Sequence, residues 1–201
     1  MKNIAVIIGH PFADSLSHAL AEKYIVKAKN TGAEVRVIDL ATISFEPIPR
    51  NLNQVRVRGI DQLDELQPSI AHMVRDLEWA DHFAFFYPVW WGTFPAVLKA
   101  FMDRAILSGV AFRYGKTGVK WDRLWRGKTA RIVLTMDAPP LWHKLTYRAP
   151  GENALKRATL WYVGVKTIGI TRFAPVRFST PEIREQWLAT AAKLGTKDAS
   201  R

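Results

Sequence analysis

Two short stretches of the sequence contain residues whose types and spacing suit ligand binding. The first, residues 9–17 (GHPFADSLS), carries the hydroxyl side chains of Ser15 and Ser17 together with His10. A helix is expected to begin at Asp14 or Ser15, because a short side-chain oxygen accepts hydrogen bonds from first-turn amides. The same amides and the helix dipole attract anions, so this stretch is predicted to cradle a phosphate. Taken alone, the pattern also fits a capped helix that binds nothing.

The second stretch, residues 88–93 (PVWWGT), is apolar and contains no acid or base. It follows an aromatic run at 83–87 and precedes Pro95, whose fixed φ suits the first turn of a helix. Large flat side chains and backbone amides on such a turn suit a planar, partly apolar ring. Trp90 and Trp91 could instead be core residues. Adjacent residues on a tight turn seldom both point inward, so at least one is expected to meet solvent or ligand.

The elements that position these stretches alternate between strand and helix along the chain. Apolar or alternating runs predict strands, and a period near 3.6 predicts helices. The predicted strands are residues 4–8, 34–40, 83–87, 128–135 and 166–173, and the predicted helices are residues 15–29, 61–79, 95–104, 153–163 and 181–194. Two long loops, 43–58 and 136–151, and a surface excursion with a possible short hairpin, 105–126, separate them.

This order of elements predicts a single domain over residues 1–201 with an α/β fold. The expected architecture is a doubly wound, five-stranded parallel sheet with helices on both faces. Ligands of such folds bind outside the carboxyl ends of the strands, which is where the second stretch follows its strand.

The composition fits one domain with a full hydrophobic core: 201 residues, 48% hydrophobic and 23% charged. Cysteine is absent, which excludes a disulfide framework, a thiolate metal site and a cysteine nucleophile. No run approaches the roughly 20 apolar residues of a membrane span. Residues 1–3 lead into a strand without a signal-peptide cleavage site, so we expect a cytoplasmic protein.

The formal net charge of +11 and the isoelectric point near 10.1 favour anionic partners. Much of the excess lies in a basic segment, residues 104–131, where Asp122 is the only acidic residue. Its basic residues are Arg104, Arg113, Lys116, Lys120, Arg123, Arg126, Lys128 and Arg131. A solvated basic surface is the simplest explanation for most of them.

The segments after the first and third strands, GHPFADSLSHAL and YPVWWGTFPAVLKAFMDR, resemble those of the flavodoxin-like NAD(P)H:quinone oxidoreductase family. Relatives of that family include the flavin-dependent ancillary proteins of bacterial potassium-efflux systems. The second motif is the more specific, and with the element order the resemblance covers nearly the whole chain. It implies strand order 2-1-3-4-5, bound FMN or FAD, and a homodimer. It also implies two-electron, ping-pong reduction of quinones or similar flat acceptors by NADH or NADPH.

The resemblance also assigns roles by position. The loop that binds the flavin phosphate and ribityl chain matches His10, Ser15, Leu16 and Ser17. The loop that holds the isoalloxazine ring matches Pro88, Val89, Trp90, Trp91 and Gly92. The flavin itself carries hydride, so few protein acids or bases are expected.

The loop after the fourth strand departs from the family pattern. Quinone reductases of the family often carry Thr-Thr-Gly-Gly there, then a Tyr and a His that help the reduced flavin shed or take up charge. Here Thr135, a flavin-binding candidate, is followed by Met-Asp-Ala-Pro-Pro at 136–140. His143 and Tyr147 lie near the expected place at different spacing, as candidate proton donors to flavin or substrate. Structural or surface roles are the alternative for both.

Other functions find less support. The sequence has no G-x-S-x-G for a hydrolase, no G-x-G-x-x-G for a Rossmann site, no metal-ligand cluster and no nucleic-acid motif. We therefore expect no metal site and no nucleic-acid partner. The alternative function is a regulatory flavoprotein subunit that binds a membrane transporter or another acidic partner through the basic segment. The choices between FMN and FAD, and between NADH and NADPH, remain open at this stage.

Overall fold

The computed structural model describes residues 1–115, 117 and 119–201. Lys116 of the basic segment and Gly118 of the predicted excursion lie outside the described residues. A five-stranded parallel sheet forms the centre of the fold, in the order β2-β1-β3-β6-β7. Its strands are β1 (Asn3–Ile8), β2 (Glu34–Asp39), β3 (His82–Pro88), β6 (Thr129–Thr135) and β7 (Lys166–Phe173). The predicted doubly wound order 2-1-3-4-5 is therefore confirmed.

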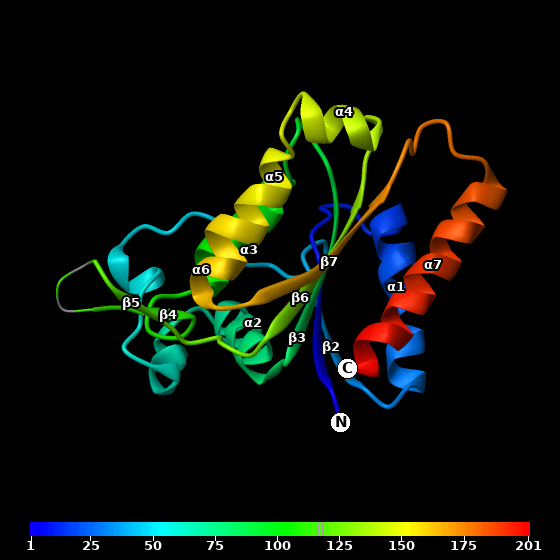
Figure 1. The fold of residues 1–201 in the computed structure, drawn as a ribbon. Coiled ribbons are helices and arrows are strands. Elements are labelled where there is room, and N and C mark those ends of the chain that lie inside the picture. The colour runs from blue at the N-terminus through cyan, green and yellow to red at the C-terminus, as the bar shows by residue number, and fades with distance from the viewer. Residues whose placement is uncertain (116, 118) are drawn as a thin grey trace.

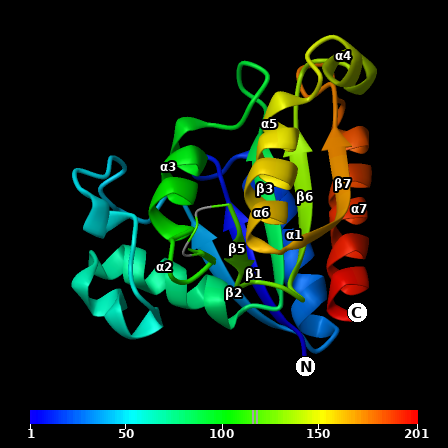
Figure 2. The same ribbon diagram turned by 60° about the vertical axis from the view of Figure 1, so that its left-hand side comes forward.

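Helices cover both faces of the sheet (Figures 1 and 2). One face carries α1 (Leu16–Asn30) and α7 (Pro181–Ala199), which pack against each other. The opposite face carries α2 (Pro68–Trp79), α3 (Ala96–Ala105) and a continuous helix made of α5 (Pro150–Asn153), η3 (Ala154–Leu160) and α6 (Trp161–Val163). The η3 segment winds as a π-helix. No helix among the described residues is both long and apolar enough to cross a membrane.

The central strand β3 is buried along its whole length. Phe83, Phe85 and Tyr87 point into the larger core beneath α2 and α3, whereas Ala84 and Phe86 point into the smaller core beneath α1 and α7. A strand covered on both faces needs apolar side chains at every position, which explains its continuous aromatic sequence.

Three predicted helix boundaries were wrong by three residues or more, and one of them is the end of the closing helix α7, which continues to Ala199 rather than ending at residue 194. The helix predicted over 61–79 is divided into a 3₁₀ turn, η2 (Ile60–Glu65), and α2, which starts at Pro68. Proline disfavours helical backbone at the residue before it, so the helix restarts there. The last sheet-covering helix before β7 begins at Pro150, three residues earlier than predicted, for the same reason.

Two segments predicted as irregular or superficial contain more structure. The loop 136–151 includes a short helix, α4 (Pro140–Leu145). The 3₁₀ turn η1 (Leu52–Gln54) interrupts the loop 43–58. The excursion 105–126 forms the expected hairpin, in which β4 (Phe112–Tyr114) pairs with β5 (Trp121–Arg123). It is not wholly superficial, because Trp125 is buried and its Nε1 donates to Glu78 Oε2 at 2.7 Å.

A buried ion cluster ties α7 to the sheet at the end opposite the loops that follow β1, β3 and β6. The Arg131 guanidinium donates to Asp198 (Nη2 to Oδ1, 2.7 Å), and the Tyr24 hydroxyl donates to Asp198 Oδ2 at 3.1 Å. His82 Nε2 lies 3.3 Å from the same carboxylate. Burial opposes ionisation of Asp198, but the hydrogen bonds and charges of Arg131 and His82 outweigh it and hold its pKa well below the usual range. Burial lowers the pKa of His82.

Replacing Asp198 with Asn should lower the free energy of unfolding by about 3–5 kcal/mol, because it leaves the buried Arg131 charge unpaired. The matched control is Asp103→Asn, which removes an exposed pair with Lys99 and should cost no more than about 0.5 kcal/mol. Both variants are measured by urea denaturation at pH 7. An equal effect of the two substitutions would contradict a stabilising role for the cluster.

The same cluster predicts that acid destabilises the wild-type fold. The pKa values of His82 and Asp198 are both lowered, so the unfolded chain binds more protons than the folded one. Stability should fall as the pH drops below about 6.5 through His82, and again below about 4 through Asp198. Urea denaturation midpoints measured from pH 7 down to below pH 4 test this prediction. A midpoint that rises on acidification would refute it.

Candidate functional site

A cavity of about 270 Å³ opens at the carboxyl ends of β1, β3 and β6. Its lining residues are His10, Leu16, Ser17, Pro88, Val89, Trp90, Thr135, Met136, Asp137 and Val176. The first seven are residues that the sequence singled out for ligand binding. The structure therefore brings the two predicted stretches and Thr135 together around one space. Ser15, Trp91 and Gly92 lie in the same loops but do not line the cavity itself.

The first loop places the start of α1 at the cavity. Ser15, rather than Asp14, caps the helix: its Oγ accepts from the His18 amide at 3.3 Å. His10 is held by its own loop, since Nδ1 lies 3.0 Å from both the nitrogen and the oxygen of Phe12. Burial lowers the pKa of His10, and the nearby His18 adds to this effect. His10 is therefore neutral at pH 7 and can offer a ring N–H without a charge.

The second loop is a tight turn with a strained residue at its tip. Trp90 and Thr93 exchange two backbone hydrogen bonds of 2.8 and 2.9 Å around Trp91 and Gly92. Both central residues have positive φ, 51° and 77°, as in a type I′ turn. Glycine adopts this conformation freely, whereas for tryptophan it costs about 1–2 kcal/mol. Trp91 is also fully exposed, so packing of its side chain does not repay this cost.

The exposure of these tryptophans confirms that at least one of them meets solvent. Trp90 is partly exposed and contacts the first loop, with its ring 5.6 Å from that of His10 and 6.1 Å from that of Phe12. Val89 N–H donates to the Thr135 carbonyl at 2.8 Å, which fixes the turn to the end of β6. The aromatic turn, the start of α1 and the loop after β6 thus form one connected rim around the cavity.

The structure does not place the two candidate proton donors in the cavity lining. His143 is buried, with Nε2 3.2 Å from Glu152 Oε1. Glu152 also accepts a hydrogen bond of 2.8 Å from Arg172 Nε. Tyr147 is half exposed and packs edge-on against His143, with 6.4 Å between ring centroids.

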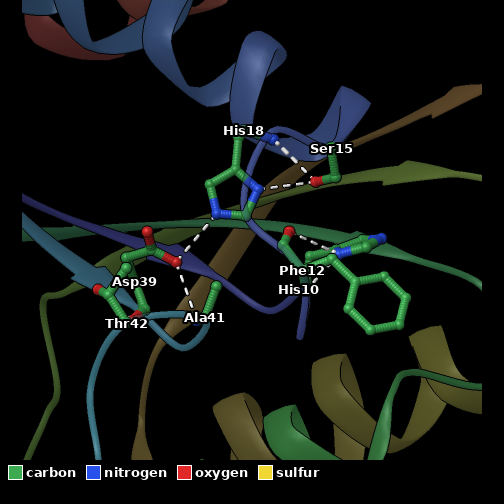
Figure 3. Close-up of polar contacts among 7 residues, drawn as sticks. All are labelled: His10, Phe12, Ser15, His18, Asp39, Ala41 and Thr42. Carbon is green, nitrogen blue, oxygen red and sulfur yellow. Dashed lines mark hydrogen bonds and ion pairs between the residues drawn. The ribbon is translucent and has the colours of Figure 1, made fainter.

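Sequence reasoning missed a polar chain beside the helix start (Figure 3). Ser15 Oγ lies 2.7 Å from His18 Nδ1, and His18 Nε2 lies 3.0 Å from Asp39 Oδ1. His18 follows the helix cap by three residues, and Asp39 ends β2, the neighbour of β1. Asp39 could have been found from the sequence, because it lies at the carboxyl end of a predicted strand, where ligands of such sheets bind. Val176, by contrast, reaches the cavity from the loop after β7 with no motif to mark it.

Comparison with known proteins places this architecture in a family. The profile of the Flavodoxin_2 family, which describes a flavodoxin-like fold, matches residues 2–195. The chain belongs to this family.

Several proteins with assigned names are similar to this Flavodoxin_2 chain. NAD(P)H dehydrogenase [quinone] 1 of Cavia porcellus is 26% identical over 206 residues, which cover 94% of this chain and 74% of the relative. The structure of an NAD(P)H:quinone oxidoreductase from Methanothermobacter marburgensis has a TM-score of 0.82 at 21% identity, over 97% of this chain and 98% of the other. An FMN-dependent NADH-azoreductase from Bacillus anthracis, in complex with FMN, has a TM-score of 0.73 at 18% identity, over 100% and 99%.

The strained turn yields a prediction about stability. Replacing Trp91 with Gly should raise the free energy of unfolding by about 1 kcal/mol, because glycine relieves the positive φ and no buried contact is lost. Replacing Gly92 with Ala should have the opposite effect, of about 1 kcal/mol. Guanidinium denaturation of both variants measures these changes. A Trp91→Gly protein less stable than wild type would show that the turn is not strained.

Proposed function

We propose that this protein is a flavin-dependent NAD(P)H oxidoreductase that reduces quinones or similar flat acceptors by two-electron, ping-pong hydride transfer. The observation that carries the proposal is the meeting of the start of α1 and an aromatic turn at one cavity, in contact through His10 and Trp90. Family membership and the names of the similar quinone reductases and azoreductase support the same activity.

The residues present fit a flavin nucleotide. At one end, the 15-residue helix α1 offers first-turn amides and the hydroxyls of Ser15 and Ser17, which suit a phosphate. At the other end, Val89 and Trp90 offer apolar surface, and the turn leaves the amides of its two central residues outside the paired Trp90–Thr93 hydrogen bonds. These two sets of groups suit a molecule that carries a phosphate at one end and a flat, partly polar ring at the other.

The chain's own residues would bind and orient the reactants. When bound, the flavin supplies the two-electron chemistry between nicotinamide and acceptor. The fully exposed Trp91 provides a flat apolar surface beside the ring position, where NADH or NADPH and then the acceptor would stack in turn. Amides of the turn that reach the ring would stabilise its charged reduced form.

A proton for the acceptor would come from Tyr147, positioned by the buried His143–Glu152 pair. Tyr147 does not line the cavity, but its half exposure leaves the phenol accessible from solvent. A Tyr147→Phe protein with an unchanged rate and solvent isotope effect would remove Tyr147 from the reaction.

The proposal is tested by the absorbance spectrum of the purified protein and by its NADH- and NADPH-dependent reduction of a quinone. Replacing Trp90 with Ala should weaken FMN binding about tenfold, the equivalent of about 1.4 kcal/mol of lost contact. Trp161→Ala is the matched control, because Trp161 is also exposed but lies on α6, outside the cavity lining. A colourless protein that takes up neither FMN nor FAD would refute the proposed flavin-dependent activity.

We further propose a homodimer. Its support is a group of exposed apolar side chains at the carboxyl end of the sheet, on and after α4: Leu141, Trp142, Leu145 and Tyr147. Such a patch marks an interaction surface in many soluble proteins. Light scattering should give about twice the chain mass of 22.8 kDa, and Leu145→Asp should shift it toward the monomer. A monomeric wild-type protein at micromolar concentration would contradict this.

An acidic partner, such as a membrane transporter, remains the second candidate role. A specific feature favours it: a groove of about 730 Å³ whose lining includes Arg123 of the basic segment and, from outside that segment, Lys156, Arg157, Lys166 and Trp161. The Arg123 guanidinium stacks 3.7 Å above the Trp161 ring. Quinone turnover that appears only when the partner is added would favour this role over the enzyme alone. A cytoplasmic location is part of both proposals.

A further inference from the structure

The chain of hydrogen bonds from Ser15 through His18 to Asp39 links the helix start to the end of β2 (Figure 3). His18 Nδ1 faces Ser15 Oγ at 2.7 Å, and His18 Nε2 faces Asp39 Oδ1 at 3.0 Å. Both the imidazole and the carboxylate are largely buried, with 16% and 22% of their side chains exposed. The His18 ring thus lies between the Asp39 carboxylate, which only accepts hydrogen bonds, and the Ser15 hydroxyl, which can donate or accept one.

Counting protons along this chain decides the direction of each bond. An ionised carboxylate only accepts, and Asp39 Oδ1 also accepts from the Ala41 amide at 3.0 Å, so His18 Nε2 carries a hydrogen. In a neutral imidazole Nδ1 is then bare, and the Ser15 hydroxyl must donate to it. In this state the hydroxyl hydrogen of Ser15 is committed to His18 and cannot reach a ligand.

Protonation of His18 reverses the Ser15 bond. An imidazolium donates from both nitrogens, so Nδ1–H would point at Ser15 Oγ while Nε2–H stays on Asp39. The hydroxyl hydrogen of Ser15 is then free to turn toward an anion at the start of α1. The added positive charge would also lie beside that anion, balanced on its far side by Asp39.

We infer that phosphate binding at the start of α1 is coupled to proton uptake by His18, which acts as a positioning residue that converts Ser15 into a hydrogen-bond donor. This inference rests on the proposed function, since the phosphate is that of the flavin nucleotide. It adds to that function a specific pH dependence and two residues, His18 and Asp39, that do not line the cavity.

The groups around His18 are consistent with this assignment. Asp39 contacts it from β2, and Asp14 and Glu22 line the same cavity of about 450 Å³ as Ser15 and His18. His10 is the other histidine nearby, with ring centroids 6.2 Å apart. Burial lowers the pKa of His10. The acidic groups among these neighbours are the carboxylates of Asp39, Asp14 and Glu22.

The test is calorimetry of FMN and riboflavin binding to the flavin-depleted full-length chain, in buffers of different ionisation enthalpy. Above pH 7 the FMN phosphate is already a dianion, since its second pKa is about 6. Wild-type protein should take up protons as FMN binds at pH 7.5 and none as riboflavin binds, because riboflavin lacks the phosphate. FMN affinity should therefore fall as the pH rises, and riboflavin affinity should not.

Substitutions assign the proton. His18→Gln should abolish the uptake and flatten the pH dependence of FMN affinity. His72→Gln is the matched control: it removes a histidine 3.4 Å from Asp76 on α2 and should leave proton uptake at the wild-type value. His10→Gln should weaken FMN binding yet retain the uptake. Uptake that survives in His18→Gln, or disappears only in His10→Gln, overturns the inference.

A second measurement does not depend on the variants folding. In wild-type protein with ¹⁵N-labelled histidine, FMN should change the His18 Nδ1 signal from that of a bare to that of a protonated nitrogen, and riboflavin should not. An Nδ1 signal unchanged by bound FMN overturns the inference alone. Failure to bind any flavin would instead overturn the proposed function, and this inference with it.

Discussion

The burial of β3 on both faces is the constraint on which the rest of the structure depends. Its side chains alternate between two cores, with Phe85 on one face of the sheet and Phe86 on the other. Two layers of helices are needed to cover such a strand, and right-handed crossovers place them. At Pro88 the backbone loses its amide donor, so the chain leaves the sheet there and enters the turn that carries the tryptophans.

Attachment to the sheet fixes the positions of the two loops proposed to bind the flavin. Gly9 N–H donates to the Phe86 carbonyl at 2.7 Å, and Val89 N–H donates to that of Thr135 at 2.8 Å. Each loop is therefore bonded to the end of a neighbouring strand before it diverges. This rigid base can support a strained residue such as Trp91, which is exposed and costs the fold stability. Strain of this kind gathers at functional sites, where ligand contacts rather than packing select the residue.

Stability and ligand binding are separated along the length of the strands. The cluster around Asp198 joins α7 to β3 and β6 at the end of the sheet opposite the cavity. Gly195 brings α7 close enough to make this contact, since a Cβ there would lie 2.2 Å from the Tyr24 carbonyl oxygen. Changes in that cluster should unfold the protein without altering the chemistry of the site. At the cavity end, exposed rings and hydroxyls remain available for ligands.

Local periodicity and capping chemistry in the sequence determined the five parallel strands and a helix start at Asp14 or Ser15. The strand order followed from the resemblance of two motifs to a known family, and so did the flavin-binding roles of the residues that line the cavity. Tertiary structure alone decided three contacts: the pairing of His18 with Asp39, the position of Val176 in the cavity lining, and the burial of His143 against Glu152. These contacts join residues from separate elements, and their distances depend on how β1, β2 and β7 lie in the sheet. A local pattern carries no record of such distances, so only the packed chain could reveal them.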